Sequence, residues 1–319
     1  MNILTPYSKE VDIEKLKESG ADELYFGFYD DEWTKTFGEF SYINRMSDFK
    51  SRANAVPFDH AADLIRQIKE NGLKAYITLN ATEYSKEQSS VLDDYLDHLS
   101  HSNPDGIIVS SLALAIQVMS HGMNAVASTM CGIFNESILS LYIEAGVRRI
   151  ILPRELTLSE IDSMCISHPE IEFEAFLMRN GCSFSDSHCL GVHGRNYGAL
   201  CQAFKKGPFR VDTLEKSFEK KNDYNWNMKI YDIMPRNNAC AVCAIYRLIR
   251  LGVFAGKIVG RNDDPESVMR DIRLIRENID IAMSSGSEEE YLEKMIFPSN
   301  HYSICIKGLG CYYPEVRFP

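Results

Sequence analysis

No apolar run in the 319-residue chain approaches the length of a membrane-spanning helix. The N-terminal stretch MNILTPYSKEVD has neither a basic segment followed by an apolar one nor a cleavage site, so it is not typical of a secretory signal. The sequence contains no internal repeat and no low-complexity tract. Its 45% hydrophobic and 25% charged residues are typical of a globular protein. These features predict a cytoplasmic protein that makes no membrane contact.

Positive charge is also scarce. The chain has 34 Lys and Arg against 45 Asp and Glu, a formal net charge of −11, and such a field repels polyphosphate unless basic residues are locally concentrated. The best local candidate runs from Lys205 to Lys221, but Glu215 and Glu219 interrupt it. We interpret this run as a solvated loop and helix. RNA binding is therefore not favoured, although a local patch or a partner would permit it, and we expect a small substrate.

Two hydrolase signatures are missing. The chain has no G-x-S-x-G nucleophile elbow and no H-E-x-x-H zinc motif. A protease mechanism would have to use Cys131, or a catalytic dyad that has no sequence signature.

The chain does contain a regular alternation of short apolar runs with longer segments of helical period, which is the pattern of βα units around a parallel sheet. The expected strands are residues 2–5, 23–28, 74–79, 106–111, 124–129, 148–153, 171–178 and 255–260. The expected helices are residues 11–19, 57–71, 86–100, 112–120, 135–145, 157–166, 241–251 and 265–282. Eight strands alternating with eight helices predict a TIM-like (β/α)8 barrel in the α/β class.

Two insertions interrupt the alternation, each on the C-terminal side of a strand, where barrel active sites are built. The first spans residues 29–55, and the second begins at residue 180, after the seventh strand, and is too long for an idle connection. We predict one barrel over residues 1–285 that includes a cysteine-bearing insertion at residues 180–243. A C-terminal helix and short tail follow at residues 286–319.

Nine cysteines in a chain expected to be cytoplasmic favour metal binding or redox work over a disulfide framework. Cys182, Cys189 and Cys201 lie in the second insertion, and Cys240 and Cys243 lie where it returns to the barrel. Thiolates on a long loop suit a soft metal centre, and an iron–sulfur cluster takes four of them. From spacing alone, zinc and a Cys182–Cys189 disulfide remain open as alternatives.

Seven segments, in order, carry a resemblance to a known family: GADELYFGF, GLKAYITLNA, PDGIIVSSLALA, AVAST, GVRRIILPRELTLSEI, FEAFLMRNGCSFSDSHC and GVFAGKIVGR. Together they resemble the peptidase U32 family over roughly residues 10–285. The resemblance implies a TIM-like barrel with an oxygen-sensitive 4Fe-4S cluster bound by four cysteines. It also implies hydroxylation of aromatic or pyrimidine rings without O2, in ubiquinone precursors, tRNA or ribosomal RNA, with prephenate as the oxygen source. Other members of the family are described as collagenase-like proteases.

Matched by position, Cys182, Cys189 and Cys201 correspond to the family's first three ligands. The fourth is Cys240 by its distance to Gly252, or Cys243 by its Cys-x-Ile context. Two further motifs depart from the family: its HAST reads VAST at residues 126–129 and its KIEGR reads KIVGR at residues 257–261. Any role of that His and that Glu is therefore lost or moved. The tail thiols Cys305 and Cys311 are expected to be spare or to contact a lid.

Polar residues that follow barrel strands are the other candidates. Arg154 directly follows the sixth strand and suits a dicarboxylate such as prephenate, with Glu155 beside it. Lys257 and Arg261 bracket the end of the last strand; salt bridges within the barrel are the alternative for them, as a helix-start ion pair is for Arg154 and Glu155. The expected catalytic residues are Arg154, Glu155, Lys257 and Arg261, and the expected substrate-binding residues are Asn80, Ser128, Thr129 and Arg45.

We therefore expect an iron–sulfur enzyme that hydroxylates an aromatic metabolite or nucleobase without O2, with the first insertion, including Trp33 and Tyr42, covering the ring. A U32-type peptidase is the first alternative. The second is a non-catalytic, cluster-bearing partner of a homologous subunit in a heteromeric hydroxylase.

Overall fold

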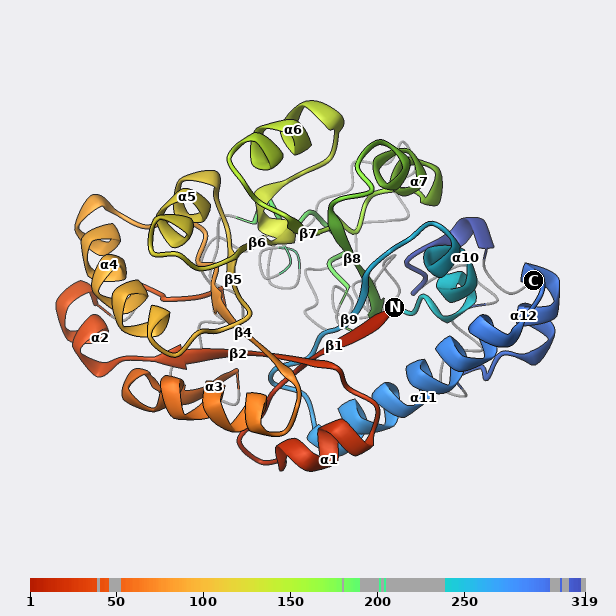
Figure 1. Cartoon of the computed structure of the whole chain (residues 1–319), viewed down its shortest axis with the longest axis horizontal. Helices are drawn as coiled ribbons and strands as arrows, with labels where there is room; N and C mark the ends of the chain where they lie inside the picture. The colour runs from red at the N-terminus through yellow and green to blue at the C-terminus, as the bar shows by residue number, and fades with distance from the viewer. Residues whose placement is uncertain are drawn as a thin grey trace, which may run out of the picture.

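The computed structural model describes residues 1–38, 41–45, 53–179, 181–189, 201, 204, 239–298, 305 and 310–316. Within these residues the strands form one parallel sheet in the order β1-β9-β8-β7-β6-β5-β4-β2-β3, and a further pairing of β1 with β2 closes it into a barrel (Figure 1). The strands are β1 (Asn2–Pro6), β2 (Glu23–Tyr29), β3 (Asn54–Pro57), β4 (Lys74–Leu79), β5 (Gly106–Val109), β6 (Ala125–Ala127), β7 (Arg149–Ile151), β8 (Glu172–Met178) and β9 (Ala255–Ile258). The predicted (β/α)8 barrel is confirmed.

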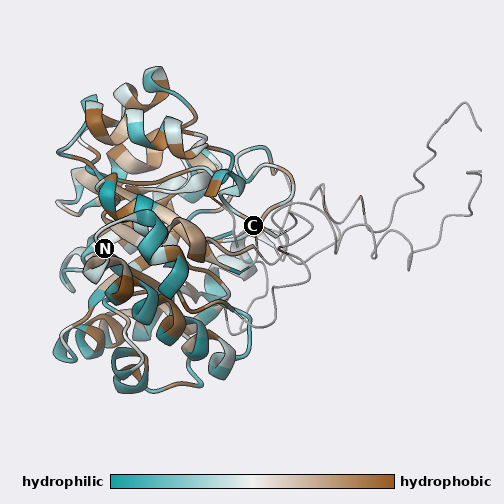
Figure 2. Cartoon of the chain, turned by 90° about the vertical axis from the view of Figure 1, so that its right-hand side faces the viewer, coloured by the Kyte–Doolittle hydropathy of each residue, from teal (hydrophilic) through white to brown (hydrophobic). Residues whose placement is uncertain are grey.

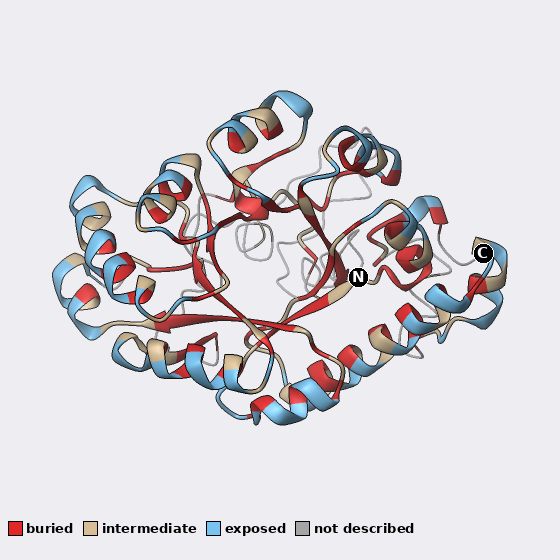
Figure 3. Cartoon of the chain, in the orientation of Figure 1, coloured by how far each residue is buried: buried red, intermediate tan, exposed pale blue. Residues whose placement is uncertain are grey.

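The helices surround the barrel and turn their apolar faces toward it, so that buried residues lie on their inner sides and exposed residues outside (Figure 3). They are α1 (Ile13–Glu18), α2 (Asp31–Phe37), α3 (Ala61–Glu70), α4 (Lys86–Ser100), α5 (Leu112–Ser120), α6 (Glu136–Glu144), α7 (Leu158–Ser167), α10 (Ile245–Arg250), α11 (Pro265–Ser284) and α12 (Glu288–Lys294). Capping boxes at Ser85 and Thr157 fix where α4 and α7 begin, because each cap satisfies free backbone N–H groups.

The region after β2 differs from the expected insertion. It contains helix α2, whose N-cap Asp30 accepts a hydrogen bond from the Glu32 backbone, and strand β3, which among the described strands pairs with the C-terminal end of β2. The short β3 has no alternating pattern and ends in proline, so no local pattern predicts a strand there. Trp33 was expected to cover a substrate ring, but it is 2% exposed and stacks on Tyr95 in the core. Tyr42 lies beyond this helix and is partly buried.

Apolar residues concentrate in the barrel strands and on the inner helix faces, whereas the outer faces of the helices are hydrophilic (Figure 2). None of the helices in the described ranges has both the length and the apolar character that crossing a membrane requires.

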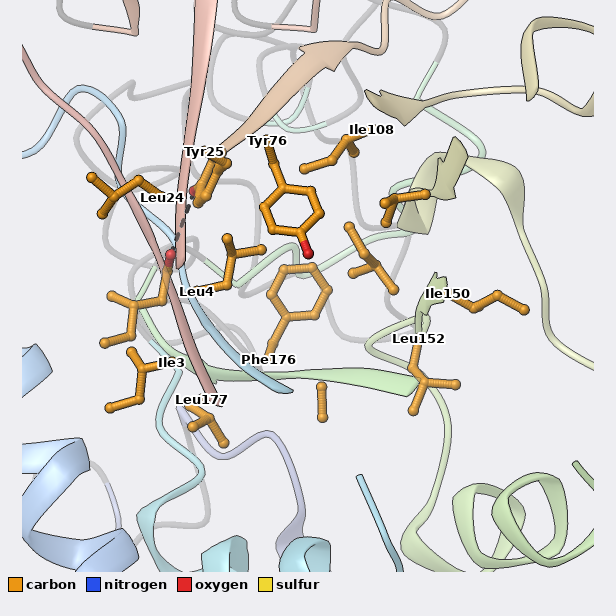
Figure 4. Packing of buried hydrophobic residues seen from close by; sticks show 14 of the residues in the cluster. Ile3, Leu4, Leu24, Tyr25, Tyr76, Ile108, Ile150, Leu152, Phe176 and Leu177 are labelled. Carbon is orange, nitrogen blue, oxygen red and sulfur yellow. Dashed lines mark hydrogen bonds between the residues drawn. The ribbon is translucent and has the colours of Figure 1, made fainter. Parts of the chain in front are cut away.

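A buried ionic network fills the N-terminal half of the barrel. The Arg149 guanidinium pairs with Glu23 and, at 3.0 Å, with Glu174, and it donates to the Tyr76 hydroxyl at 2.7 Å. The Lys257 ammonium lies 2.9 Å from the other Glu174 oxygen. Both carboxylates are fully buried, and these cations are their ion-pair partners in the barrel interior. Above this network, Figure 4 shows the rings of Tyr25, Tyr76 and Phe176 in the barrel interior among aliphatic side chains.

We predict that Arg149→Met lowers the free energy of unfolding by about 3–5 kcal/mol, because buried Glu23 loses its closest cation and buried Glu174 keeps only Lys257 as a close one. Urea denaturation measures the effect. The matched control is Arg66→Met, whose side chain is 64% exposed and whose surface ion pairs contribute at most about 1 kcal/mol. Equal losses in the two variants would show that the network does not stabilise the barrel.

Candidate functional site

A buried carboxylate joins two arginines at the C-terminal end of the barrel. Asp186 follows β8, Arg154 follows β7, and Arg45 lies in the connection after β2 and α2. The Asp186 carboxylate is 2.6 Å from Arg154 Nε and 2.5 Å from Arg45 Nη1. Because the C-terminal ends of parallel strands meet at one side of a barrel, three segments far apart in the sequence share this contact.

The charge state of this group follows from its surroundings. Burial alone would raise the pKa of the Asp186 carboxyl, but the guanidiniums of Arg45 and Arg154 outweigh burial and hold this pKa well below its usual range. Asp186 is therefore ionised, and it neutralises only one of the two arginines. The buried Nε of Arg45 has no hydrogen-bond partner within the described ranges, so a donor remains for a ligand.

Arg154 is held on three sides. Besides Asp186, its Nη1 donates to the Tyr312 hydroxyl at 2.5 Å, and its guanidinium lies 3.5 Å from the centre of the Phe176 ring. Burial opposes its charge, but Tyr312 and Asp186 more than compensate and raise the pKa of the Arg154 guanidinium. Arg154 is thus a fixed cation on an aromatic face.

A third arginine, Arg261, follows β9 and points into the barrel. Its Nη1 donates to Thr78 Oγ1 at 2.8 Å and, with longer bonds, to Asn44 Oδ1 and the Ala53 carbonyl oxygen. No carboxylate lies within ion-pair distance of Arg261 in the part of the chain that the structure describes. Burial, opposed by Tyr25 and reinforced by the positive charge of Arg45, lowers its pKa to about 10, so it stays protonated at neutral pH.

Gly27 in β2 explains how this guanidinium fits. A Cβ at this position would lie 2.8 Å from Arg261 Nη1, 2.8 Å from Asn44 Nδ2 and 2.5 Å from Asn54 Oδ1. Only glycine leaves room for the arginine and its two amide neighbours, which accounts for the glycine in the strand segment ELYFGFY.

Among the described residues, Asp186 is therefore the one carboxylate paired within the group of Arg45, Arg154 and Arg261, and the aromatic rings of Tyr25, Phe176 and Tyr312 lie beside Arg154 and Arg261. An excess of fixed positive charge beside aromatic faces in a buried setting can bind an anionic ligand that has a planar group.

The other predicted site residues are placed as follows. Asn80 Oδ1 accepts the Arg45 backbone N–H at 3.2 Å, and Thr129 Oγ1 donates to Asp186 at 3.5 Å, so both adjoin the arginine group. Ser128 caps a 3-10 turn by accepting from the Met130 backbone. Lys257 is committed to Glu174, deeper in the barrel. Glu155 is partly buried in the turn after Arg154, and no contact joins it to the arginine group within the described residues.

Two of the predicted thiols lie beside the arginine group. Cys182 and Cys189 flank Asp186 along the chain, and the Cys189 backbone N–H donates to the Asp186 carbonyl at 3.2 Å. Burial and the Asp186 charge raise the pKa of the Cys182 thiol to about 11, although the Phe184 backbone N–H, Arg45 and Arg154 favour its thiolate. Both thiols lie near the Arg45 guanidinium.

Cys240, Cys243, Cys305 and Cys311 form a second group that the sequence did not predict. The backbone of Cys240 pairs with that of Cys311, with Cys240 N donating to the Gly310 carbonyl at 2.9 Å. Burial raises the pKa of the Cys240 thiol, and the nearby Cys243, Cys311 and Cys305 add to that effect. The tail cysteines are therefore neighbours of the predicted fourth ligand.

Within the described residues, no three His, Cys, Asp or Glu side chains are arranged to hold a metal ion. Cys201 is described, but residues 190–200 on one side of it and most of residues 202–238 on the other are not. A common metal centre for Cys182, Cys189, Cys201 and either Cys240 or Cys243 therefore stays a prediction.

Sequence reasoning missed two residues of the site. Asp186 lies within the stretch NGCSFSDSHC, which we interpreted only through its cysteines. Its position between two candidate metal ligands was the one signal that could have identified it. Tyr312 lies in the tail, and nothing in the sequence pairs it with Arg154.

Comparison with known proteins bears on this arrangement. The sequence profile of Peptidase family U32 matches residues 11–304. The chain belongs to Peptidase family U32. This match covers the barrel, the cysteine-bearing insertion and part of the tail, so the family assignment extends over nearly the whole chain.

Relatives within the U32 family have different names. An uncharacterized protease of Methanocaldococcus jannaschii is 25% identical over 307 residues, 92% of this chain and 68% of that protein. A collagenase of Porphyromonas gingivalis is 23% identical over 305 residues, 90% of this chain and 67% of that protein. A tRNA hydroxylation protein P1 of Bacillus subtilis is 23% identical over 261 residues, 77% of this chain and 60% of that protein.

We predict that Asp186→Asn lowers the free energy of unfolding by about 3–5 kcal/mol at neutral pH, because two buried guanidiniums lose their shared carboxylate. The folded-state pKa of Asp186 is depressed, so its stabilisation is fully present above the unfolded pKa of about 3.9 and is lost as the pH falls through the folded value. Urea denaturation at several pH values should show that the difference in free energy of unfolding between wild type and variant becomes smaller in acid.

The control is Asp63→Asn, an acid that is 54% exposed and pairs with Arg66 on the surface of α3, where about 1 kcal/mol or less is expected. A gap for Asp186→Asn that is small, or that does not change with pH, would contradict the role given to this carboxylate.

Proposed function

We propose that this U32 protein is an enzyme that binds an anionic aromatic ligand at the arginine group and hydroxylates an aromatic metabolite or nucleobase without O2, with prephenate or a similar dicarboxylate as the oxygen source. The observation that carries the proposal is the buried excess of positive charge: Arg45, Arg154 and Arg261 against Asp186. A dicarboxylate supplies the negative charge that this group lacks.

Each arginine has a separate part in binding. Arg154 is fixed by Asp186 and Tyr312 on the Phe176 face, so it presents its guanidinium in one orientation. Arg261 is held by neutral acceptors, so an incoming carboxylate would face no competing acid there. A ligand with two carboxylates can engage both arginines, while its ring lies against the aromatic side chains and excludes water.

The net charge of the chain and the names of its relatives together bear on whether the aromatic substrate is a small molecule or RNA. Three relatives named for tRNA hydroxylation, from Bacillus subtilis and two strains of Helicobacter pylori, support a hydroxylase and bring RNA into consideration. The net charge of −11 opposes binding of a long polyphosphate. We therefore favour a small aromatic substrate. RNA is the alternative substrate for the same hydroxylation, and a local basic patch or a homologous partner subunit would bind it.

The proposed 4Fe-4S cluster depends on family resemblance and cysteine spacing. Within the described residues no group of three His, Cys, Asp or Glu side chains is arranged to hold a metal ion. When bound, such a cluster would supply a redox-active iron centre. The binding steps above involve only the chain's own side chains.

Peptidase activity has less support, although two relatives are named protease and collagenase. Cys131 was the one named residue that the sequence offered as a protease nucleophile. Its thiol donates to the Val109 carbonyl at 3.4 Å, and burial raises its pKa to about 11, so it is a protonated thiol at neutral pH. A cysteine nucleophile requires the thiolate.

We predict that Arg154→Met and Arg261→Met each weaken prephenate binding about 10- to 100-fold, the loss expected for charge-assisted hydrogen bonds of about 1.5–3 kcal/mol. Isothermal titration calorimetry under anaerobic conditions measures the affinities. Arg148→Met is the matched control, since Arg148 is exposed before β7, at the opposite end of the barrel. If neither test substitution changes the affinity for prephenate, the proposed carboxylate-binding role of Arg154 and Arg261 is wrong.

We predict that protein purified without oxygen contains about four iron and four sulfide atoms per chain. Cys182→Ser and Cys189→Ser should each abolish most of this content, whereas Cys165→Ser, a buried thiol of α7, should leave it unchanged. Iron and acid-labile sulfide assays decide the matter. Wild-type protein that holds no iron and cleaves a protein substrate would reverse the order of the two functions.

A further inference from the structure

The C-terminal tail supplies a side chain to the arginine group. The Tyr312 hydroxyl accepts a hydrogen bond from Arg154 Nη1 at 2.5 Å and donates one to the Arg179 carbonyl at 2.7 Å. Its ring stacks on Phe176 with 6.0 Å between centroids, and the residue is 4% exposed. Both hydrogen-bonding roles of the phenol are thus used, and one of them fixes a substrate-binding candidate.

The tail is docked at several points, so the position of Tyr312 is well determined. The Tyr312 backbone N–H donates to the Cys240 carbonyl at 3.1 Å, and Cys240 in turn donates to Gly310. The Glu315 carboxylate accepts the Leu158 backbone N–H at 3.0 Å, at the first residue of α7. The tail therefore links the segment before α10 to the beginning of α7, across the end of the barrel.

We propose that Tyr312 is a positioning residue, which orients Arg154 so that its guanidinium binds a carboxylate of the substrate. The proposal rests on the proposed function, because it assigns a role within the same site. It also gives the C-terminal tail a part in ligand recognition, in addition to the part of the barrel residues.

The geometry explains how the phenol acts. Asp186 holds Arg154 at Nε and Tyr312 holds it at Nη1, and among the described residues no hydrogen bond occupies Nη2. Two anchors on different nitrogens fix the plane of a guanidinium, whereas one anchor lets it turn about that bond. Because the phenol keeps its proton for the Arg179 carbonyl, its lone pair stays directed at Arg154. Both N–H groups of Nη2, and the second N–H of Nη1, then remain as donors for a ligand.

The test is a double-substitution cycle on prephenate affinity, measured by anaerobic calorimetry. Tyr312→Phe keeps the ring and removes the hydroxyl, and we expect the dissociation constant to rise about tenfold. Tyr313→Phe is the matched control: it is the next residue, also buried, and no described hydrogen bond depends on its hydroxyl, so a change of less than about twofold is expected.

The same Tyr312→Phe change is then made in an Arg154→Lys background. If Tyr312 acts through Arg154, the second change costs less than about twofold there, because coupled residues are not additive. A full tenfold loss in both backgrounds would overturn the proposal, since Tyr312 would then act independently of Arg154. Equal affinities of Tyr312→Phe and Tyr313→Phe proteins would overturn it too.

The outcomes also separate this inference from the proposed function. If wild-type protein binds prephenate and Tyr312→Phe does not weaken it, only the positioning role falls. If wild-type protein binds no prephenate, the proposed function and the positioning role fall together. Thermal unfolding of each variant shows whether the tail remains docked, and a shift confined to Tyr312→Phe without loss of affinity would assign the tyrosine a purely structural role.

Discussion

The candidate site depends on one buried carboxylate shared by two arginines. Asp186 brings together the connection after β2 and the ends of β7 and β8, and it leaves the group with more positive than negative charge. A buried ion pair of this kind adds little net stability, but it is costly to break, and it fixes the geometry of its members. Among the described residues, the arginine group therefore carries an excess of positive charge that suits an anionic ligand.

The barrel separates two kinds of charge. In its N-terminal half, Glu23 and Glu174 are matched by Arg149 and Lys257, so this network is closed and serves the fold. At the C-terminal end, the group of Arg45, Arg154 and Arg261 has one carboxylate partner, Asp186, among the described residues. Closed networks near the bottom and an open one near the mouth agree with the rule that barrels place stability and function at opposite ends.

The fold could be predicted from the sequence because alternating β and α periods extend along most of the chain, and every expected strand was found in the structure. Strand β3 was not predicted because its four residues, which end in proline, show no alternation of apolar and polar side chains. In the site, Arg154 and Arg261 were predictable because each directly follows a strand. Asp186 and Tyr312 were not, because their contacts join segments 32 and 158 residues away in the chain, and no local pattern reports such pairing.

The thiols illustrate the same limit. The structure places Cys240 beside the tail residue Cys311, which no local pattern reports, and the shared metal centre of Cys182, Cys189, Cys201 and either Cys240 or Cys243 stays a prediction. The central claim, that the arginine group binds an anionic ligand, is tested most directly by a crystal structure of anaerobically prepared protein with prephenate. The account predicts carboxylate oxygens within hydrogen-bonding distance of Arg154 and Arg261. Prephenate bound elsewhere, with both guanidiniums left without an anion, would contradict it.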